Sequence, residues 1–444
     1  MKRRKAEIQV TAKKTETFRA LKNKQLVDEM NKNLLVENPD DFQRRAFQDE
    51  VLNLDPEFIS SSFKHDIINV DDIGLVEEEE QDFSDKFLQH DFRTWPMDAQ
   101  HFGYLSEQTI ASMLLTTDCK EITIGDGRSI SFAAASQAGY YPTKNGKENE
   151  DSFLCGVNAT NPSKQFSGDE LVEDHNALFS IFDGHGPTGK ACSTFVRDVV
   201  EKEFEHQLES TKRRRDIEGI FNDAYMEANE RLIQNNDFDT DYSGTTAVSL
   251  CLEGGFFHVA NVGDSRCVLA SRSSKDEDYY VQDLSDDHTP VREDEYKRIR
   301  SNGGIILTSD QYDTMEDSQH SAMTFSSVVS DSSSSIEPLR VWATGGKYPG
   351  SAFTRSIGDG VAKSLGVTAE PEHSKRQITD NHEFFILGSD GIFDFISSKE
   401  AVDIVSTCAD ANEACRALIG TSYARWIKQE ERTDDITVIV GFLS

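Results

Sequence analysis

The chain contains short apolar runs, rich in β-branched and aromatic residues, that are separated by polar, turn-forming segments. Runs of this length and composition predict β-strands. The predicted strands are Ala177–Phe182, Thr246–Leu252, Phe256–Asn261, Phe384–Leu387 and Ile436–Phe442.

Three other segments repeat apolar residues at the spacing of one helix face, which predicts amphipathic helices. They are Ala191–Phe204, Ile217–Leu232 and Ala411–Lys428. Helices therefore come between groups of strands, without strict strand-helix alternation. This order favours an α+β fold with antiparallel sheets over a doubly wound parallel sheet.

We assign residues 121–444, where this patterning is dense, to one globular domain, and residues 1–120 to an N-terminal extension that is partly helical or disordered. Within the extension, Thr15–Leu35 predicts a solvated helix. The acidic run Glu77–Glu80 is typical of a solvated or disordered segment. The region Phe92–Leu115 is richer in aromatic and aliphatic residues, so we expect it to dock onto the domain.

One segment interrupts the pattern of the domain. Residues 308–337 are rich in Ser and Asp and show little periodicity. Such a composition cannot build a core, so we predict a mobile surface insertion.

The net charge narrows the range of partners. The chain carries 79 acidic and 46 basic side chains, which gives a formal charge of -33. This charge argues against a general affinity for nucleic acid or anionic membranes. An anionic substrate would need a local reversal of the field, which bound divalent cations commonly provide.

The seven cysteines form no CxxC pair and no cluster with histidine, which indicates a reducing compartment. No apolar run approaches the roughly 20 residues of a membrane helix. The basic start Met1–Lys5 is not followed by an apolar signal core. We therefore expect a soluble intracellular protein in the cytoplasm, the nucleus or both.

Four acidic motifs lie where a predicted strand meets a loop, so their carboxylates can converge on one rim of a sheet. An oxygen-rich cluster of this kind suits Mg²⁺ or Mn²⁺ better than zinc. Each Asp-Gly pair alone is more typical of an ordinary turn. Their joint occurrence favours a site. The motifs are Asn149–Asp151, Phe182–Gly186, Ser389–Asp394 and Thr433–Ile436.

In this order, and with further small-residue turns, the motifs resemble the type 2C metal-dependent serine/threonine protein phosphatases, the PPM family. The resemblance covers about Ala133 to Leu443 and leaves out the first hundred or so residues. The further segments that carry it are Ser243–Ala247, Asn261–Arg266, Leu284–Pro290, Phe353–Asp359 and Glu370–Glu372.

The resemblance implies a sandwich of two antiparallel sheets flanked by helix pairs, with metals in a cleft at one end. It also implies hydrolysis of phosphoserine and phosphothreonine in phosphoprotein substrates, with two Mg²⁺ or Mn²⁺ per active site and positions for a third. Mapped by motif, Asp183 bridges two metals, Gly184 offers its carbonyl to the first, Asp390 and Asp434 bind the second, Glu150 and Asp151 hold metal-bound waters, and Asp264 and Asp394 match the weaker third metal.

The chemistry expected of the residues agrees with this mapping. Two cations can activate a bridging water for in-line attack and neutralise charge on the phosphoryl oxygens. The leaving alkoxide needs a proton, and His185, directly after the metal ligands Asp183 and Gly184, has a suitable intrinsic pKa to act as general acid. We expect the other histidines, including His288, to be structural.

One position departs from the family pattern. Many relatives carry an arginine four residues before the first acidic ligand, where this chain has Gly146. Lys147 can still supply positive charge to the substrate phosphate, but it lacks the planar fork of arginine. We take Lys147 as the candidate substrate-binding residue.

Two alternatives differ in class. The first is a catalytically silent relative that acts as a regulatory binding module; the presence of Asp183, Asp390 and Asp434 argues against it. The second is a metal-dependent phosphohydrolase of small molecules, which the metal ligands alone do not exclude. We expect a monomer that binds neither nucleic acid nor membranes.

Overall fold

The computed structural model describes most of the C-terminal three quarters of the chain. The predicted helix at Thr15–Leu35, the acidic run Glu77–Glu80 and Gly146 lie outside the described residues. The residues that the structure describes are 91–97, 105–124, 127–142, 147–160, 165–167, 170–172, 175–209, 216–274, 277–314, 324–326, 328, 337–346 and 348–444.

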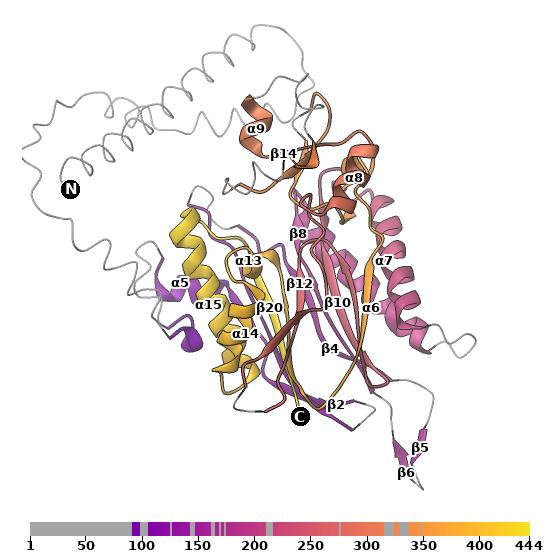
Figure 1. Cartoon of the computed structure of the whole chain (residues 1–444), viewed down its shortest axis with the longest axis vertical. Coiled ribbons are helices and arrows are strands. Elements are labelled where there is room, and N and C mark those ends of the chain that lie inside the picture. Colours follow the sequence, from indigo (N-terminus) through magenta and orange to yellow (C-terminus); the bar gives the residue numbers. More distant parts are fainter. Residues whose placement is uncertain are drawn as a thin grey trace, which may run out of the picture. The chain divides into compact units, whose positions relative to one another are not determined.

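Two antiparallel sheets form the centre of the described domain (Figure 1). The first has the order β1-β3-β20-β19-β12-β13, with β2 also paired to β3, and the second has the order β18-β11-β10-β7-β4. The strands of the first are β1 Leu114–Thr116, β2 Lys120–Thr123, β3 Ser129–Gln137, β12 Arg266–Ser271, β13 Tyr280–Asp283, β19 His382–Gly388 and β20 Ile436–Leu443. Those of the second are β4 Ser152–Thr160, β7 His175–Phe182, β10 Ala247–Glu253, β11 Phe256–Val262 and β18 Glu372–Gln377.

The central strands are apolar throughout because both of their faces are covered. In β19, Phe384 and Ile386 belong to the core under the helices, whereas Phe385 and Leu387 belong to the core between the two sheets. This alternation follows the two-residue period of a strand. The α+β prediction, with a two-sheet sandwich flanked by helix pairs, is confirmed.

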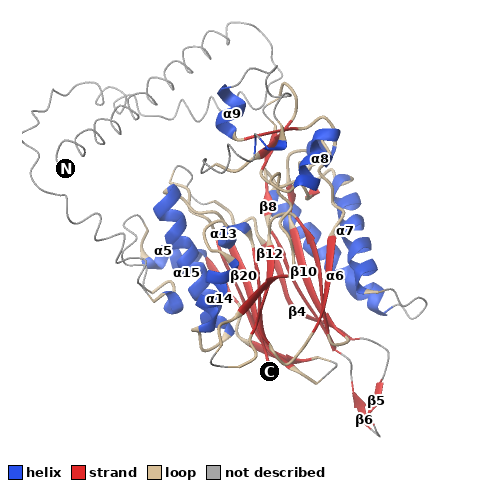
Figure 2. Cartoon of the chain, viewed as in Figure 1, coloured by secondary structure: helices blue, strands red, loops and turns tan. Residues whose placement is uncertain are grey.

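Helices cover the outer face of each sheet (Figure 2). α15 packs on β3 and β20 with α14 beside it, and α6 and α7 pack together over the second sheet. Capping side chains define several starts; Ser397 and Glu400, for example, form a capping box at α14. The bounds are α5 Glu107–Met113, α6 Gly189–Glu209, α7 Ile217–Ile233, α8 Glu293–Ser301, α9 Ser309–Thr314, α12 Gly360–Lys363, α13 Asp390–Phe393, α14 Ser398–Ser406 and α15 Ala411–Glu430.

Three smaller sheets also lie within the described residues, and one of them contains Gly184 and His185. β8 Gly184–His185, β9 Gly244–Thr245 and β17 Ile357–Gly358 form one sheet in the order β17-β9-β8. The others are β14 Ile305–Leu307 with β15 Arg340–Trp342 and β16 Pro349–Ser351, and β5 Gln165–Ser167 with β6 Glu170–Val172.

The Ser/Asp-rich insertion contributes more to the core than its composition predicts. Its start forms α9, the side chain of Val328 is fully buried, and the ring of Phe325 lies 5.0 Å from that of Tyr296. The described part of this segment therefore contributes apolar side chains to the core. Most of 315–336 lies outside the described residues, so its mobility stays a prediction.

The described parts of the region Phe92–Leu115, residues 92–97 and 105–115, pack onto the domain. The short helix η2 Phe92–Thr94 lies against α15, where Phe92, Trp95 and Ile110 are buried in the core under the helices. β1 then pairs with β3. The structured unit therefore begins before residue 121.

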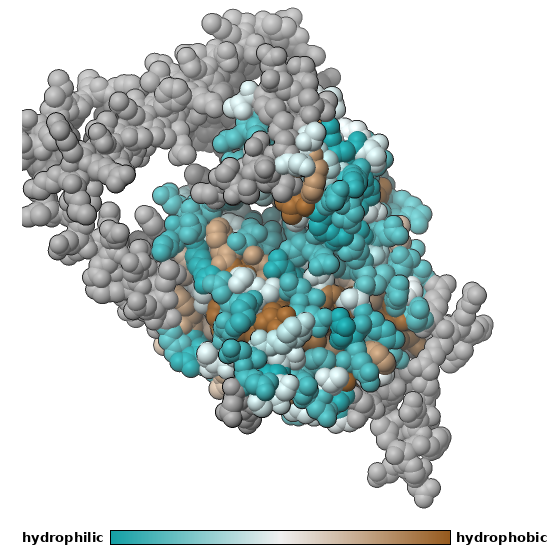
Figure 3. Space-filling model, viewed as in Figure 1, coloured by the Kyte–Doolittle hydropathy of each residue, from teal (hydrophilic) through white to brown (hydrophobic). Residues whose placement is uncertain are grey.

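The surface of the described residues is largely hydrophilic in the view of Figure 3, in keeping with the high net charge. All seven cysteines are free thiols. Among the described residues, none of the helices combines the length and apolar character that crossing a membrane requires.

Candidate metal-binding active site

The acidic motifs converge because antiparallel neighbours place the end of one strand beside the start of the next. Asp183 follows β7, and Glu150 precedes its partner β4; Phe182 pairs with Ser152. Likewise, Asp390 comes just after β19, and Asp434 comes just before β20. All four residues line one cleft of about 730 Å³.

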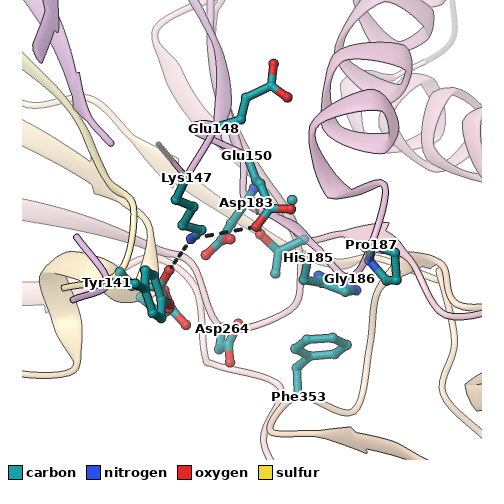
Figure 4. Close-up of a pocket in the computed structure, with 14 residues that line it drawn as sticks. Tyr141, Lys147, Glu148, Glu150, Asp183, His185, Gly186, Pro187, Asp264 and Phe353 are labelled. Atoms are coloured by element: carbon teal, nitrogen blue, oxygen red, sulfur yellow. Dashed lines mark hydrogen bonds and ion pairs between the residues drawn. The ribbon is translucent and has the colours of Figure 1, made fainter. Parts of the chain in front are cut away.

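The cleft collects most of the residues predicted from the sequence (Figure 4). Two of the ten predicted residues do not line it: Asp151 is buried behind the cleft, and Asp394 is an exposed residue that follows α13. Tyr141, Glu148 and Phe353 also line the cleft. The predicted residues in its lining are Lys147, Glu150, Asp183, Gly184, His185, Asp264, Asp390 and Asp434.

The carboxylates in and behind the cleft are poorly neutralised. Burial, followed by the repulsion of Asp390 and Asp151, raises the pKa of Asp183 well above its ordinary value. Burial and Asp434 raise the pKa of Asp390 to about 6. Burial and Asp435 raise the pKa of Asp151 to about 8. A site that raises the pKa of several acids together favours a bound cation.

The donor set fits Mg²⁺ or Mn²⁺. It consists of carboxylates with the Gly184 carbonyl, and hard divalent cations prefer such oxygen ligands. The Oδ1 atom of Asp151 is buried and has no hydrogen-bond partner among the described residues, although Oδ2 accepts from Thr437. An uncompensated buried oxygen of this kind is expected where water or an ion binds.

Lys147 brings one positive charge to this rim. Its Nζ lies 3.1 Å from Asp434 Oδ1, 3.1 Å from Asp435 Oδ2 and 3.6 Å from Glu150 Oε2. Burial opposes the charge, but Asp434 and Asp435 raise the pKa of Lys147 above its ordinary value. Lys147 therefore lies where the sequence places it, and its ammonium pairs with the acids.

A second acidic group meets a geometric criterion for metal binding. Among the described residues, Asp294, Glu295 and Glu372 form the group whose ligand oxygens all lie within 4.8 Å of one another. Arginines already occupy these oxygens: Arg355 Nη2 lies 2.8 Å from Glu295 and 3.1 Å from Glu372. This network is a set of ion pairs, and it needs no metal.

His185 is held by contacts on two sides. Its Nε2 lies 2.7 Å from Asp359 Oδ2, and its ring centroid lies 4.4 Å from that of Phe353. Burial would raise the pKa of Asp359, but the charge and hydrogen bond of His185 keep that pKa below its ordinary value. The imidazole thus lies in the cleft beside Asp183 with one nitrogen engaged.

Comparison with known proteins decides the family. A family model described as "Protein phosphatase 2C" matches residues 143–430. The chain belongs to the protein phosphatase 2C family. It is a metal-dependent protein serine/threonine phosphatase.

Two curated relatives from Arabidopsis thaliana carry phosphatase 2C names. "Probable protein phosphatase 2C 35" is 39% identical over 310 residues, which cover 70% of this chain and 82% of the relative. "Probable protein phosphatase 2C 61" is 31% identical over 269 residues, which cover 60% and 75%. The fold resembles the crystal structure of serine-threonine phosphatase 2C from Toxoplasma gondii, with a TM-score of 0.52 and 20% identity over 74% of this chain and 99% of that one.

Sequence reasoning assigned no role to two acids that support this phosphatase 2C site. Asp435 accepts hydrogen bonds from the main-chain N–H groups of Gly139 and Glu150, at 2.6 and 2.8 Å. It therefore connects the Thr433–Ile436 motif to the Asn149–Asp151 motif and to the residues after β3. Asp359 is the partner of His185. The signal for Asp359 lies in the Phe353–Asp359 motif, and that for Asp435 lies in the Thr433–Ile436 motif, directly after the predicted ligand Asp434.

Proposed function

We propose that this chain hydrolyses phosphoserine and phosphothreonine in proteins, by attack of a water held between two divalent cations, with His185 as general acid. The observation that supports the proposal best is the set of poorly neutralised carboxylates lining the cleft that also contains His185. A phosphate ester entering this cleft would meet both groups that its hydrolysis needs.

The carboxylates have distinct proposed roles. Asp183 would bind both cations, the Gly184 carbonyl the first, and Asp390 with Asp434 the second. Bound Mg²⁺ or Mn²⁺ would supply an activated water and positive charge at the phosphoryl oxygens. Glu150 and Asp151 would orient water ligands, with Asp151 Oδ1 as the free acceptor, and Asp264 and Asp394 would serve a third, weaker position.

Lys147 would bind the substrate phosphate once Asp434 is engaged as a ligand. The ammonium now shares Asp434 and Asp435. With Asp434 occupied, one donor of Lys147 is released toward the cleft, which Lys147 already lines. Because a lysine ammonium is a point charge, we expect it to steer the phosphate without fixing its orientation.

We propose a monomeric enzyme that acts on phosphoproteins in the cytoplasm or the nucleus. The free thiols are the usual state of cysteines in a reducing compartment. The charge of -33 supports a partner other than nucleic acid.

Phosphate release from a phosphothreonine peptide, measured with Mn²⁺, with Mg²⁺ and with EDTA, tests the proposed reaction. We expect turnover with the metals and none with EDTA. Hydrolysis of 4-nitrophenyl phosphate without hydrolysis of any phosphopeptide would instead favour a small-molecule phosphohydrolase. No turnover of either substrate with either metal would overturn the proposal.

The role of His185 has its own test. Replacing it by Gln would remove the proton donor, so we expect His185→Gln to slow the phosphothreonine peptide about 100-fold. The loss on 4-nitrophenyl phosphate would be much smaller, because nitrophenolate leaves without a proton. Equal losses on both substrates would contradict the general-acid role.

A further inference from the structure

The small sheet β17-β9-β8 links His185 to an acid far away in the sequence. His185 is the last residue of β8, and Asp359 comes directly after β17. Between them lies β9, in which Gly244 pairs with both His185 and Gly358. The pairing His185–Gly244–Gly358 across the sheet therefore brings Asp359, the residue after Gly358, close to His185.

Gly244 leaves the space through which the carboxylate passes. A Cβ atom at this position would lie 2.3 Å from Asp359 Oδ2 and 2.5 Å from the Ile357 carbonyl. Neither distance is compatible with a side chain. Because the central strand is open here, Asp359 Oδ2 reaches within 2.7 Å of His185 Nε2.

The backbone of Asp359 adopts a conformation that L-residues seldom use. Its φ and ψ are 54° and 57°, in the left-handed region. The main chain holds this conformation firmly: Asp359 N donates to Ser243 O at 3.0 Å, and Gly360 N donates to Thr240 O at 2.9 Å. Glycine or asparagine would fit this turn as well as aspartate does, so the turn alone does not account for a carboxylate.

The surroundings of the carboxylate point to His185 as its partner. Asp359 is 5% exposed, so its charge is not directed to solvent. On the other side of the imidazole, Phe353 packs at 4.4 Å between ring centroids. The ring is thus fixed by a charged hydrogen bond on one nitrogen and by an aromatic contact on its face.

We infer that Asp359 is a positioning residue, which holds the His185 ring in one orientation and leaves Nδ1 as the nitrogen that serves the substrate. This inference rests on the proposed role of His185 as general acid. In the reaction, the water oxygen bonds to phosphorus, the bond from phosphorus to the serine or threonine oxygen breaks, and the proton on Nδ1 passes to that oxygen. Second groups that orient an acid or a base in this way are common in enzymes.

The variant Asp359→Asn, which keeps the shape of the side chain and suits the left-handed turn, tests the inference. We expect it to slow the phosphothreonine peptide about 10- to 100-fold, within the range of general-acid contributions. Turnover of 4-nitrophenyl phosphate would change less than about 3-fold, since that leaving group needs no proton donor. Mn²⁺ affinity, measured by calorimetry, would be unchanged, because Asp359 is not among the proposed metal ligands. A residue that only supports the fold would instead slow the turnover of both substrates together.

Two further variants keep the test decisive. Asp359→Gly retains the backbone preference and removes the side chain, so it would reproduce the selective loss if Asn perturbs folding. The matched control Asp237→Asn removes an exposed acid from the loop between α7 and β9 and would leave both substrates unaffected.

A double variant separates this inference from the proposed function. If Asp359 acts through His185, the variant with both Asp359→Asn and His185→Gln would be no slower than His185→Gln alone. Additive losses, or equal losses of Asp359→Asn on both substrates, would overturn the inference. If His185→Gln itself shows no leaving-group dependence, the general-acid role fails first, and that outcome is visible without any Asp359 variant.

Discussion

Two groups of acidic side chains lie in the same domain, and they differ in how their charge is compensated. In the cleft, burial and neighbouring carboxylates raise the pKa of Asp183 and Asp390. Beneath α8, burial would also raise the pKa of Glu295, but hydrogen bonds from Arg298 and Arg355 lower it to about 2. Arginines of the chain neutralise the second group, whereas the first is the group that we propose to bind cations.

This difference teaches that spacing alone does not identify a metal site. The arginine-paired group is the one whose oxygens lie within 4.8 Å of one another among the described residues. Among the described residues, the cleft acids form no group that meets this criterion, yet theirs are the carboxylates with raised pKa values. Charge compensation distinguishes the two groups, and the following variants are chosen to test that distinction.

The largest expected effect is that of Asp183→Asn on activity. Loss of the proposed shared ligand would lower Mn²⁺-dependent phosphopeptide turnover by about 1000-fold or more, in the range seen when a central electrostatic contribution is removed. The metal-free protein would not lose stability, since one repelling charge is gone. Steady-state kinetics and thermal unfolding measure the two effects, with the exposed Asp380→Asn as control.

In the arginine-paired group, the effect is expected on stability. Glu295 is fully buried, so Glu295→Gln would remove the charge that pairs with both Arg298 and Arg355 and lower the free energy of unfolding by about 3 kcal/mol. Urea unfolding without metal measures this change. Glu293→Gln, which breaks only the exposed pair with Lys297, would cost less than about 0.5 kcal/mol. Equal stability losses for Asp183→Asn and Glu295→Gln would remove the contrast.

Both the fold and the acids were largely predictable, for identifiable physical reasons. Strands covered on both faces, such as β19 and β20, leave continuous apolar runs. Other strands leave no such trace: β18 is an edge strand with the polar sequence EHSKRQ, and the centre of β3, Ala133–Ala135, is buried but small. Hydrophobic patterning could not reveal them.

The partners of the proposed general acid and of the proposed phosphate-binding lysine could not be predicted from local sequence. Lys147 pairs with Asp434 and Asp435, which lie 287 and 288 residues later in the sequence. His185 pairs with Asp359, which lies 174 residues later, across the small sheet. These contacts depend on which strand ends meet. The arginine-paired group likewise joins α8 to β18 and was not foreseen.

The pH dependence of stability without metal would distinguish the two groups further. The pKa of Asp390 is raised to about 6 and that of Asp151 to about 8, from an ordinary 3.8. The folded protein then binds more protons than the unfolded chain between about pH 4 and 8, so stability falls as the pH rises through this window. The contribution of Glu295, with its pKa lowered to about 2, is lost only as the pH falls from about 4.5 toward 2.

Thermal unfolding in EDTA across this pH range measures the effect. In parallel samples with saturating Mn²⁺ in place of EDTA, stability would fall less as the pH rises above 6, because bound cations would neutralise the carboxylates in place of the protons. A metal-free protein whose stability increases steadily from pH 5 to 8 would show that the cleft acids are compensated within the chain.

The smallest effect is expected for Lys147→Gln, which removes a lysine that lines the cleft. We expect KM for the phosphopeptide to rise about 3- to 10-fold, because a single charge contact to the phosphate is lost. Lys147→Arg would restore most of the affinity. A fall in kcat with unchanged KM would instead assign Lys147 to the support of Asp434 and Asp435.

Calorimetric titration of Mn²⁺ into the metal-free full-length protein tests the central claim most directly. The account predicts saturable binding of at least two ions to the wild type, unchanged binding to Glu293→Gln and loss of this binding in Asp183→Asn. Binding that persists in Asp183→Asn but is lost when Glu372, in the arginine-paired group, is replaced by Gln would contradict it.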